Sequence, residues 1–356
     1  MNEEKGSENV LDYNKKLSII IPVYKTEKYL TKCLDSVLKA TDDRMEVLII
    51  NDGSPDNSEK IILQYQEKYP NLFAYYKKEN GGLSDVKNYG LKRVQGEFVI
   101  FLDSDDYVEP SIYKDMLKTA EDEQADVVIC DAVMDYENGM ESQRVSCTSD
   151  SKESLFCRIL DTWLMPASWN KLVRTELYHG LEFPKGLNNE DVCVTPIVLS
   201  RAKKISVINT PYYHYVQRNG SIQNSQFSEK RFVILDTVKL AIERMKECDK
   251  QKQQDVKDTL YLHQILAIAM YPIREMEDKL ERRRLLEIFM ERIYQLFPDF
   301  MEARSFQALI KWGNPLMRWY RKRTLKLLEQ RKYDEVCKFW DFCNIGFHGI
   351  KKIRGH

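Results

Sequence analysis

The chain has 356 residues, more than one typical hydrophobic core holds, so its length predicts a main domain with an attachment. Hydrophobic residues make up 43% of the sequence and charged residues 31%, as in ordinary globular proteins. The formal net charge of -1 argues against a protein that binds nucleic acid.

The two ends of the sequence differ in charge. Met1–Lys16 is polar and lacks the apolar core of a signal peptide, so we expect a cytoplasmic protein. Ala303–His356 has 13 Lys and Arg against 4 Asp and Glu, on an otherwise acidic chain. A basic tail of this kind indicates contact with an anionic surface. The eight cysteines form no C-x-x-C pair, which favours reduced thiols over disulfides or a zinc site.

The first part of the chain alternates between predicted strands and helices. Ile19–Ile21 and Val47–Ile50 are continuous apolar runs, which fit parallel strands covered on both faces. Between these runs, Leu30, Cys33 and Val37 have helical spacing. The alternation predicts a doubly wound α/β fold. The strand candidates are Leu17–Val23, Glu46–Ile50, Leu72–Lys77, Glu97–Leu102 and Asp126–Met134.

The later part of the chain is irregular at first and then helical. Glu153–Ser225 contains several prolines and short apolar pieces, and we interpret it as the second half of the same domain. From Glu229 onward the apolar residues have helical spacing almost throughout. Leu260–Ile273 is too short to span a bilayer, which favours a buried helix.

The residues that follow the first four strands are the ones expected to meet a ligand. Ligands on open α/β sheets bind beyond the carboxyl ends of the strands. These ends carry, in chain order, an aromatic residue, a lone acid, a glycine-rich turn and an acid cluster. Their convergence is more informative than any one of them alone. The segments are Pro22-Val23-Tyr24, Asn51-Asp52-Gly53-Ser54, Glu79–Ser84 and Asp103–Asp106.

The acid cluster Asp103-Ser104-Asp105-Asp106 is the sharpest of these signals. Three carboxylates repel one another unless a cation joins them, and hard oxygen ligands favour Mg²⁺ or Mn²⁺. A solvated acidic turn with a helix cap explains the same residues without a metal. A phosphorylation pocket of a signalling receiver is a third interpretation, but receivers are much shorter and the glycine-rich turn would remain unexplained.

Asn80-Gly81-Gly82 forms a tight turn that opens a helix. Backbone N–H groups in such a turn are placed to bind a phosphate, although for this turn alone we favour a simple loop. The sequence has neither G-x-G-x-x-G nor G-x-x-x-x-G-K-[ST]. It therefore lacks the specific signals for dinucleotide binding and for P-loop hydrolysis.

Two polar segments lie further along the chain. Glu190 and Asp191 precede an apolar run, so they serve either as helix N-terminal charges or as a general base. His214 lies among tyrosines, a pattern more typical of a packed core residue than of a ligand. Arg218 makes the following loop suitable for binding anions, which favours a functional role for the segment.

From Leu17 to about Ile222 the sequence resembles the family-2 inverting glycosyltransferases with the GT-A fold. The order and the spacing of all the motifs agree with that family, and the resemblance covers somewhat over half of the chain. The matching motifs are S-I-I-I-P-V-Y (18–24), N-D-G-S (51–54), E-N-G-G-L-S (79–84), K-N-Y-G-L (87–91), F-L-D-S-D-D (101–106), W-N-K-L (169–172), N-E-D (189–191) and Y-H-Y-V-Q-R-N-G-S-I (213–222).

The resemblance implies roles for individual residues on the donor side. Tyr24 would stack on the uracil of a UDP-sugar, and Asp52 would accept a hydrogen bond from that base. Asp103 would lie by the ribose and the metal, and Asp105 would ligate a Mn²⁺ or Mg²⁺ that bridges the diphosphate. His214 would be a further ligand of the metal or the phosphate.

The remaining implied roles concern the reaction itself. Asp191 would be the general base, and Arg218 would clamp the leaving diphosphate. Trp169 and Glu190 would contact the acceptor or the donor sugar. The other donor-binding residues that the resemblance implies are Pro22, Asn80, Gly81, Lys87 and Ser104.

The chain departs from the family pattern at two places. Lys25 stands where the family usually has Asn, and Val86-Lys87 stands where Ala-Arg is common. Lys87 keeps the positive charge but lacks the two-pronged geometry of arginine. Both departures make the details of donor binding less certain to infer from the family, and they leave the implied activity unchanged.

The resemblance implies a domain organisation and a reaction. Residues 1–225 would form the GT-A domain, with a nucleotide-binding half at about 17–134 and an acceptor-side half at about 150–225, and 226–356 a helical domain. The enzyme would move a hexose or N-acetylhexosamine from a UDP-sugar to a hydroxyl of a lipid-linked or protein-linked glycan at the bacterial cell surface. A teichoic-acid or capsule transferase and a non-catalytic partner subunit are the alternatives.

The basic tail has several interpretations of its own. Between Lys311 and Lys332, eight Lys and Arg residues with interleaved Leu, Trp and Tyr face a single Glu. A basic amphipathic helix with aromatic residues can lie on an anionic membrane, here at the inner face. A packed helix with a solvated basic face, or a homodimer contact, explains the same pattern, and we slightly favour these simpler interpretations.

Overall fold

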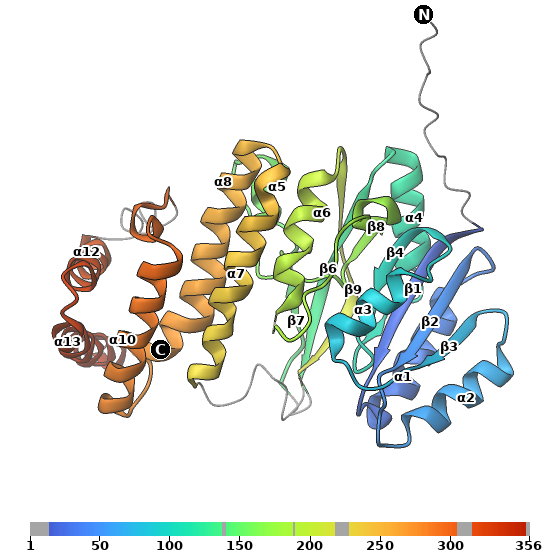
Figure 1. The fold of residues 1–356 in the computed structure, drawn as a ribbon, viewed down its shortest axis with the longest axis horizontal. Coiled ribbons are helices and arrows are strands. Elements are labelled where there is room, and N and C mark those ends of the chain that lie inside the picture. The colour runs from blue at the N-terminus through green and yellow to red at the C-terminus, as the bar shows by residue number, and fades with distance from the viewer. Residues whose placement is uncertain (1–13, 137–139, 188, 218–227, 305–314, 354–356) are drawn as a thin grey trace, which may run out of the picture. The chain divides into compact units, whose positions relative to one another are not determined.

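The computed structural model describes residues 14–136, 140–187, 189–217, 228–304 and 315–353 (Figure 1). Packing divides the chain into two compact units, each assembled from segments that are separate in sequence. The first unit consists of Met1–Ser149, Pro166–Gly186 and Arg201–Asn219, and the second of Asp150–Met165, Leu187–Ser200 and Gly220–His356. Packing does not test independent folding, so the domains at 1–225 and 226–356 stay a prediction.

The first unit contains a mixed sheet with the strand order β3-β2-β1-β4-β8-β6-β9-β5, to which β7 adds by pairing with β6. β3, β2, β1 and β4 are mutually parallel, whereas β8 runs antiparallel to both of its neighbours. The strands are β1 (Lys15–Val23), β2 (Met45–Asn51), β3 (Phe73–Lys77), β4 (Gly96–Phe101), β5 (Tyr107–Val108), β6 (Val127–Tyr136), β7 (Gln143–Val145), β8 (Lys171–Arg174) and β9 (Ile205–Gln217).

The described part of this unit also contains four α-helices and one 3₁₀-helix. The apolar spacing predicted for the first helix is confirmed, because Leu30, Cys33, Leu34 and Val37 are all buried on one face. α1 packs against α2 and α4, while α3 packs against β1 and β2. The elements are α1 (Glu27–Ala40), α2 (Ser58–Lys68), α3 (Leu83–Leu91), α4 (Ile112–Glu123) and the 3₁₀-helix η1 (Thr175–Tyr178).

The sequence pattern predicts this layout well. All five predicted strands form, each within about two residues of its expected bounds, and every residue of β2 is buried. Apolar runs with no polar face can form stable strands only where both faces of the sheet are covered. The predicted doubly wound α/β fold is therefore confirmed.

The second unit is helical. Its described helices include none that is long and apolar enough to cross a membrane. The predicted buried segment 260–273 is helical, but Leu260–Met270 has π-helical rather than α-helical hydrogen bonding. The elements are α5 (Leu155–Leu160), η2 (Glu190–Cys193), α6 (Thr195–Arg201), η4 (Glu229–Phe232), α7 (Val233–Arg244), η5 (Met245–Glu247), α8 (Lys250–Thr259), η6 (Leu260–Met270), α9 (Tyr271–Arg274), α10 (Lys279–Leu296), η7 (Phe300–Glu302), α12 (Pro315–Glu329) and α13 (Tyr333–Ile353).

The close approach of β4 to β1 makes a testable prediction about Gly96. A Cβ atom at Gly96 would lie 2.4 Å from the backbone nitrogen of Ser18 and 2.7 Å from the carbonyl oxygen of Phe98. Backbone atoms of paired strands cannot move aside, so Gly96→Ala should lower the free energy of unfolding by about 3 kcal/mol. Urea denaturation followed by circular dichroism measures this loss.

Gly180→Ala is the matched control. Gly180 has a φ of 71° with no atom within 4 Å of an added Cβ, so alanine there meets backbone strain alone. We expect a loss of about 1 kcal/mol. Equal losses at Gly96 and Gly180 would contradict the close approach of the two strands.

Candidate functional site

The carboxyl ends of four parallel strands meet at one edge of the first unit. The amide of Asp52, after β2, donates to the carbonyl of Val23 at the end of β1 (3.0 Å). The amide of Leu102, after β4, donates to the carbonyl of Ile20 in β1 (3.0 Å). The parallel register thus brings the predicted aromatic residue, lone acid, glycine-rich turn and acid cluster to the same edge.

Asp52 organises the glycine-rich turn. Its buried carboxylate accepts hydrogen bonds from the backbone N–H groups of Gly81 (2.9 Å) and Gly82 (2.8 Å) and from the Lys78 ammonium (2.6 Å). The Asn80 side-chain amide donates to the Asp52 carbonyl (3.0 Å). The turn's N–H groups thus bind a carboxylate of the chain itself, which favours the simple loop over a phosphate cradle. A carboxylate accepts about four hydrogen bonds, so a further donor can still bind Asp52.

The turn after β1 exposes an aromatic ring. Pro22 is buried in β1, while the Tyr24 side chain is 42% exposed and available for stacking. Lys25 has a φ of 55°, in the left-handed region, and its amide donates to the Ser54 hydroxyl (2.8 Å). Asn tolerates this conformation better than Lys does, which gives a physical reason for the family's usual residue at this position.

The acid cluster after β4 is held in place by β9. The Asp106 carboxylate is buried and accepts hydrogen bonds from the Tyr213 hydroxyl (2.6 Å) and from the Val216 amide (2.8 Å). The Asp103 amide donates to the same Tyr213 oxygen (3.3 Å). Asp103 and Asp105 are only partly buried. One carboxylate of the cluster therefore anchors the turn, and two remain partly open to solvent.

Negative charge accumulates at this turn. Burial, with the charges of Asp105 and Asp103, raises the pKa of the Asp106 carboxyl well above its usual range. Burial and the same three carboxylates also raise the pKa of the Cys33 thiol. A divalent cation would offset this repulsion, and the oxygens of Asp103 and Asp105 are ligands that Mg²⁺ and Mn²⁺ prefer. The chemistry of these donors thus fits the predicted metal.

His214 lies between two other acids. Its Nδ1 lies 3.0 Å from an oxygen of Asp135, its Nε2 lies 2.8 Å from an oxygen of Glu109, and its ring stacks on Tyr107 with centroids 4.2 Å apart. Within the ranges that the structure describes, no three His, Cys, Asp or Glu side chains are grouped to hold a metal. The structure does not group His214 with the acid cluster, and its role as a metal ligand stays a prediction.

Three other predicted binding residues are buried. The hydroxyls of Ser104 and Thr26 lie 3.0 Å apart, which ties the acid turn to the start of α1. The Lys87 ammonium donates to the Ser168 hydroxyl (3.1 Å). Trp169 is 7% exposed and stacks on two tyrosines of β9, with ring centroids 4.1 and 5.6 Å away. In this structure these side chains support the edge of the sheet from within.

The predicted base belongs to the second unit. Glu190 and Asp191 begin the 3₁₀-helix η2, as expected of acids at the start of a helical run, and Asn189 before them has a left-handed φ of 59°. Glu190 is 8% exposed, whereas Asp191 is partly exposed. The Cys193 thiol donates to the Thr237 carbonyl of α7 (3.1 Å), which anchors the helix. The half-open carboxylate of the pair is thus Asp191.

The sequence does not predict the roles of two residues of the site. Lys78 pairs with both Asp52 (2.6 Å) and Asp85 (2.7 Å), and Tyr213 joins the two ends of the acid turn. Lys78 could be identified from the sequence, because it is a cation that directly follows β3 and so lies at the same sheet edge as Asp52. Arg218, the predicted diphosphate clamp, lies outside the described residues.

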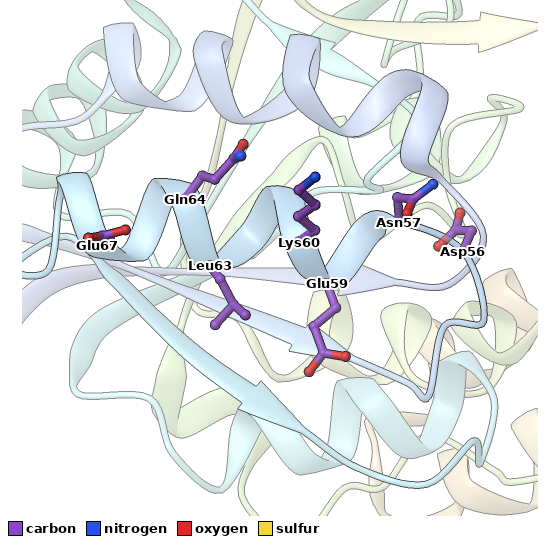
Figure 2. A pocket seen from close by; sticks show the side chains of 7 residues that line it. All are labelled: Asp56, Asn57, Glu59, Lys60, Leu63, Gln64 and Glu67. Atoms are coloured by element: carbon purple, nitrogen blue, oxygen red, sulfur yellow. The ribbon is translucent and has the colours of Figure 1, made fainter.

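A hollow of about 540 Å³ lies along α2, and Figure 2 shows the side chains that line it. Its lining comes from α2 and the turn before it, and none of the predicted site residues contributes. Polar side chains of a single helix do not enclose a ligand, so this hollow carries no site. It is lined by Asp56, Asn57, Glu59, Lys60, Leu63, Gln64 and Glu67.

Known proteins resemble the chain in both sequence and fold. Residues 18–181 match the family described as glycosyl transferase family 2. EpsH of Bacillus subtilis strain 168 is 37% identical over 210 residues, which are 56% of this chain and 60% of EpsH. Poly(ribitol-phosphate) beta-N-acetylglucosaminyltransferase TarS of Staphylococcus aureus strain Mu50 is 30% identical over 218 residues, which are 60% of this chain and 37% of TarS. The match spans at most 60% of either relative.

A solved structure extends the likeness in fold. The crystal structure of S. aureus TarS 1–349 in complex with UDP-GlcNAc has a TM-score of 0.69 at 23% identity. The likeness covers 93% of this chain and 92% of that one, and it confirms the predicted GT-A-like fold with a helical C-terminal region. Residues 18–181 are thus those of a glycosyl transferase family 2 protein, and the chain is related to the bacterial polysaccharide and teichoic acid glycosyltransferases of that family.

Proposed function

We propose that the chain transfers a hexose or N-acetylhexosamine from a UDP-sugar to a hydroxyl group of a glycan acceptor, with inversion at the anomeric carbon. The acceptor would belong to cell-surface polysaccharide, glycoprotein or teichoic acid synthesis. The protein would act in the cytoplasm with Mn²⁺ or Mg²⁺.

One observation carries this proposal: the ends of the parallel strands β1, β2 and β4 present complementary groups at one edge. Tyr24 offers an exposed ring for a nucleobase, the buried Asp52 offers a hydrogen-bond acceptor, and Asp103 and Asp105 offer oxygens for a cation. Membership of the family supports the reaction type. The name of TarS and its complex with UDP-GlcNAc support a UDP-sugar donor and a glycan-polymer acceptor.

The chemistry divides among the residues of the chain. Asp103 and Asp105 would hold a divalent cation, which when bound offsets the negative charge of the leaving diphosphate. Asp191 takes the proton of the acceptor hydroxyl while that oxygen bonds to the anomeric carbon and the bond from that carbon to UDP breaks. A single displacement of this kind inverts the configuration. Arg218 would clamp the departing diphosphate.

A non-catalytic partner subunit is the alternative from another class. Such a subunit could keep the fold without any need for the acids at positions 103, 105 and 191. The chain retains all three, and the first two lie where the donor site is expected, which favours the enzyme.

The metal proposal predicts the behaviour of Asp105→Ala. Removing one charged oxygen ligand should lower sugar transfer at least 100-fold and should weaken UDP binding in the presence of Mn²⁺, as measured by calorimetry. Excess EDTA should reduce the native protein to the same level. Asp122→Ala, at an exposed acid of α4, is the matched control and should behave like the native protein. Full activity of the native protein in EDTA would exclude the metal role.

The proposed base predicts a different outcome for Asp191→Asn. Asn keeps the shape of the side chain but cannot take a proton, so transfer should fall by about 10²–10⁴-fold. Binding of UDP and Mn²⁺ should stay nearly native. If Asp191 served only as an N-terminal charge of η2, Asn would keep most of the activity, because it suits helix starts nearly as well.

Glu190→Gln is the paired variant, and it separates the two neighbouring acids. Near-native transfer by Asp191→Asn together with a collapse in Glu190→Gln would move the base to Glu190.

A further inference from the structure

Helix α12 has one buried face and one exposed face. Tyr320, Thr324, Leu327 and Leu328 are buried at helical spacing. The Trp340 indole N–H donates to the Thr324 hydroxyl (3.3 Å), which fixes α12 against α13. The buried face is therefore committed to the packing of the second unit, and the opposite face is free to meet a partner.

The exposed face of α12 is strongly basic. Arg318, Lys322 and Lys326 recur every fourth residue and so line up along the helix, with Arg323 beside them. All four side chains are exposed, and none forms an ion pair with any residue in the described ranges. Other basic side chains of this unit form ion pairs with acids, as Arg282 does with Asp341. The charge of these four side chains is thus not neutralised by acids of the described residues.

Large apolar side chains are exposed on α12 itself and on α13, which packs against it. Leu316 is 49% exposed, and Trp319 is 50% exposed although its ring contacts Phe339 of α13 (centroids 5.3 Å apart). Phe342, one turn after Phe339 on α13, is 71% exposed. A basic face that contacts only water would not need these residues, because the exposure of aromatic rings to water contributes no favourable free energy.

We infer that this surface, the basic face of α12 with Leu316, Trp319 and Phe342, docks the protein on an anionic lipid bilayer. Cations attract anionic headgroups, and indole, phenyl and leucine side chains enter the interfacial region. Contacts with the phosphates of duplex DNA need cations alone, so the exposed apolar residues favour a bilayer over duplex DNA. The first 302 residues carry an excess of acids, so the basic C-terminal segment is the part of the sequence suited to an anionic lipid.

Vesicle flotation of the full-length chain tests this inference. The native protein should float with phosphatidylcholine vesicles that contain about 30 mol% phosphatidylglycerol, and should not float with pure phosphatidylcholine. Binding should disappear in about 0.5 M NaCl, where the Debye length is only a few ångströms.

A charge variant and its matched control locate the surface. Removing Arg318, Lys322 and Lys326 together by substitution to Gln should weaken vesicle binding on the order of 100-fold, since each cation near an anionic membrane contributes about fivefold. The control changes three exposed lysines elsewhere in the same unit, so it removes the same total charge, and it should bind like the native protein. The control substitutions are Lys239→Gln, Lys246→Gln and Lys250→Gln.

An apolar variant tests the other half of the surface. Phe342→Ser should weaken vesicle binding about tenfold without changing the thermal midpoint, because the ring is mostly in water. Equal binding by the charge variant and its control would overturn the inference. Binding to single-stranded DNA without binding to anionic vesicles would also overturn it. The same holds if the native protein does not bind vesicles but sediments as a dimer that the α12 substitutions dissociate.

Discussion

β1 is hydrogen-bonded on both sides to parallel strands, β2 and β4, and this pairing is the constraint on which the candidate site depends. Parallel strands end at the same edge, so residues about 80 positions apart in sequence become neighbours. The pairing is possible only where two faces of the sheet are covered, which the fully buried β2 shows. Gly96 sets how closely β4 can approach β1. The stability of the sheet and the placement of the candidate site therefore both depend on the pairing of β1 with β2 and β4.

The carboxylates at the site edge differ in their burial and in their hydrogen-bond partners. Asp52 and Asp106 are buried and bind groups of the chain itself, so they hold the glycine-rich turn and the acid turn in position. Asp103 and Asp105 are partly exposed, and their charges add to the burial that raises the pKa of Asp106. The buried acids thus support the two turns, while the partly exposed acids keep oxygens open to solvent, and composition alone does not reveal this difference.

The sequence predicts the strands, the first helix and the glycosyltransferase family because each rests on a local pattern. The run Val47–Ile50 within β2 is apolar throughout, and the motifs occur in a fixed order. The contacts of single side chains depend on long-range packing and could not be predicted. Tyr213 is reached only through β9, about 110 residues after the acid turn that it holds. His214 meets Asp135 and Glu109 for the same reason. The Thr26 hydroxyl, at the start of α1, makes no capping hydrogen bond and lies 3.0 Å from the Ser104 hydroxyl.

Release of nucleoside diphosphate from a panel of donors tests the central claim most directly. The panel contains UDP-glucose, UDP-galactose, UDP-GlcNAc and GDP-mannose, each with Mn²⁺ and without an acceptor. Slow hydrolysis of at least one UDP-sugar, and none of GDP-mannose, is the result that the uracil-binding role of Tyr24 and Asp52 predicts. Release of GDP from GDP-mannose with no release of UDP from any UDP-sugar would contradict it.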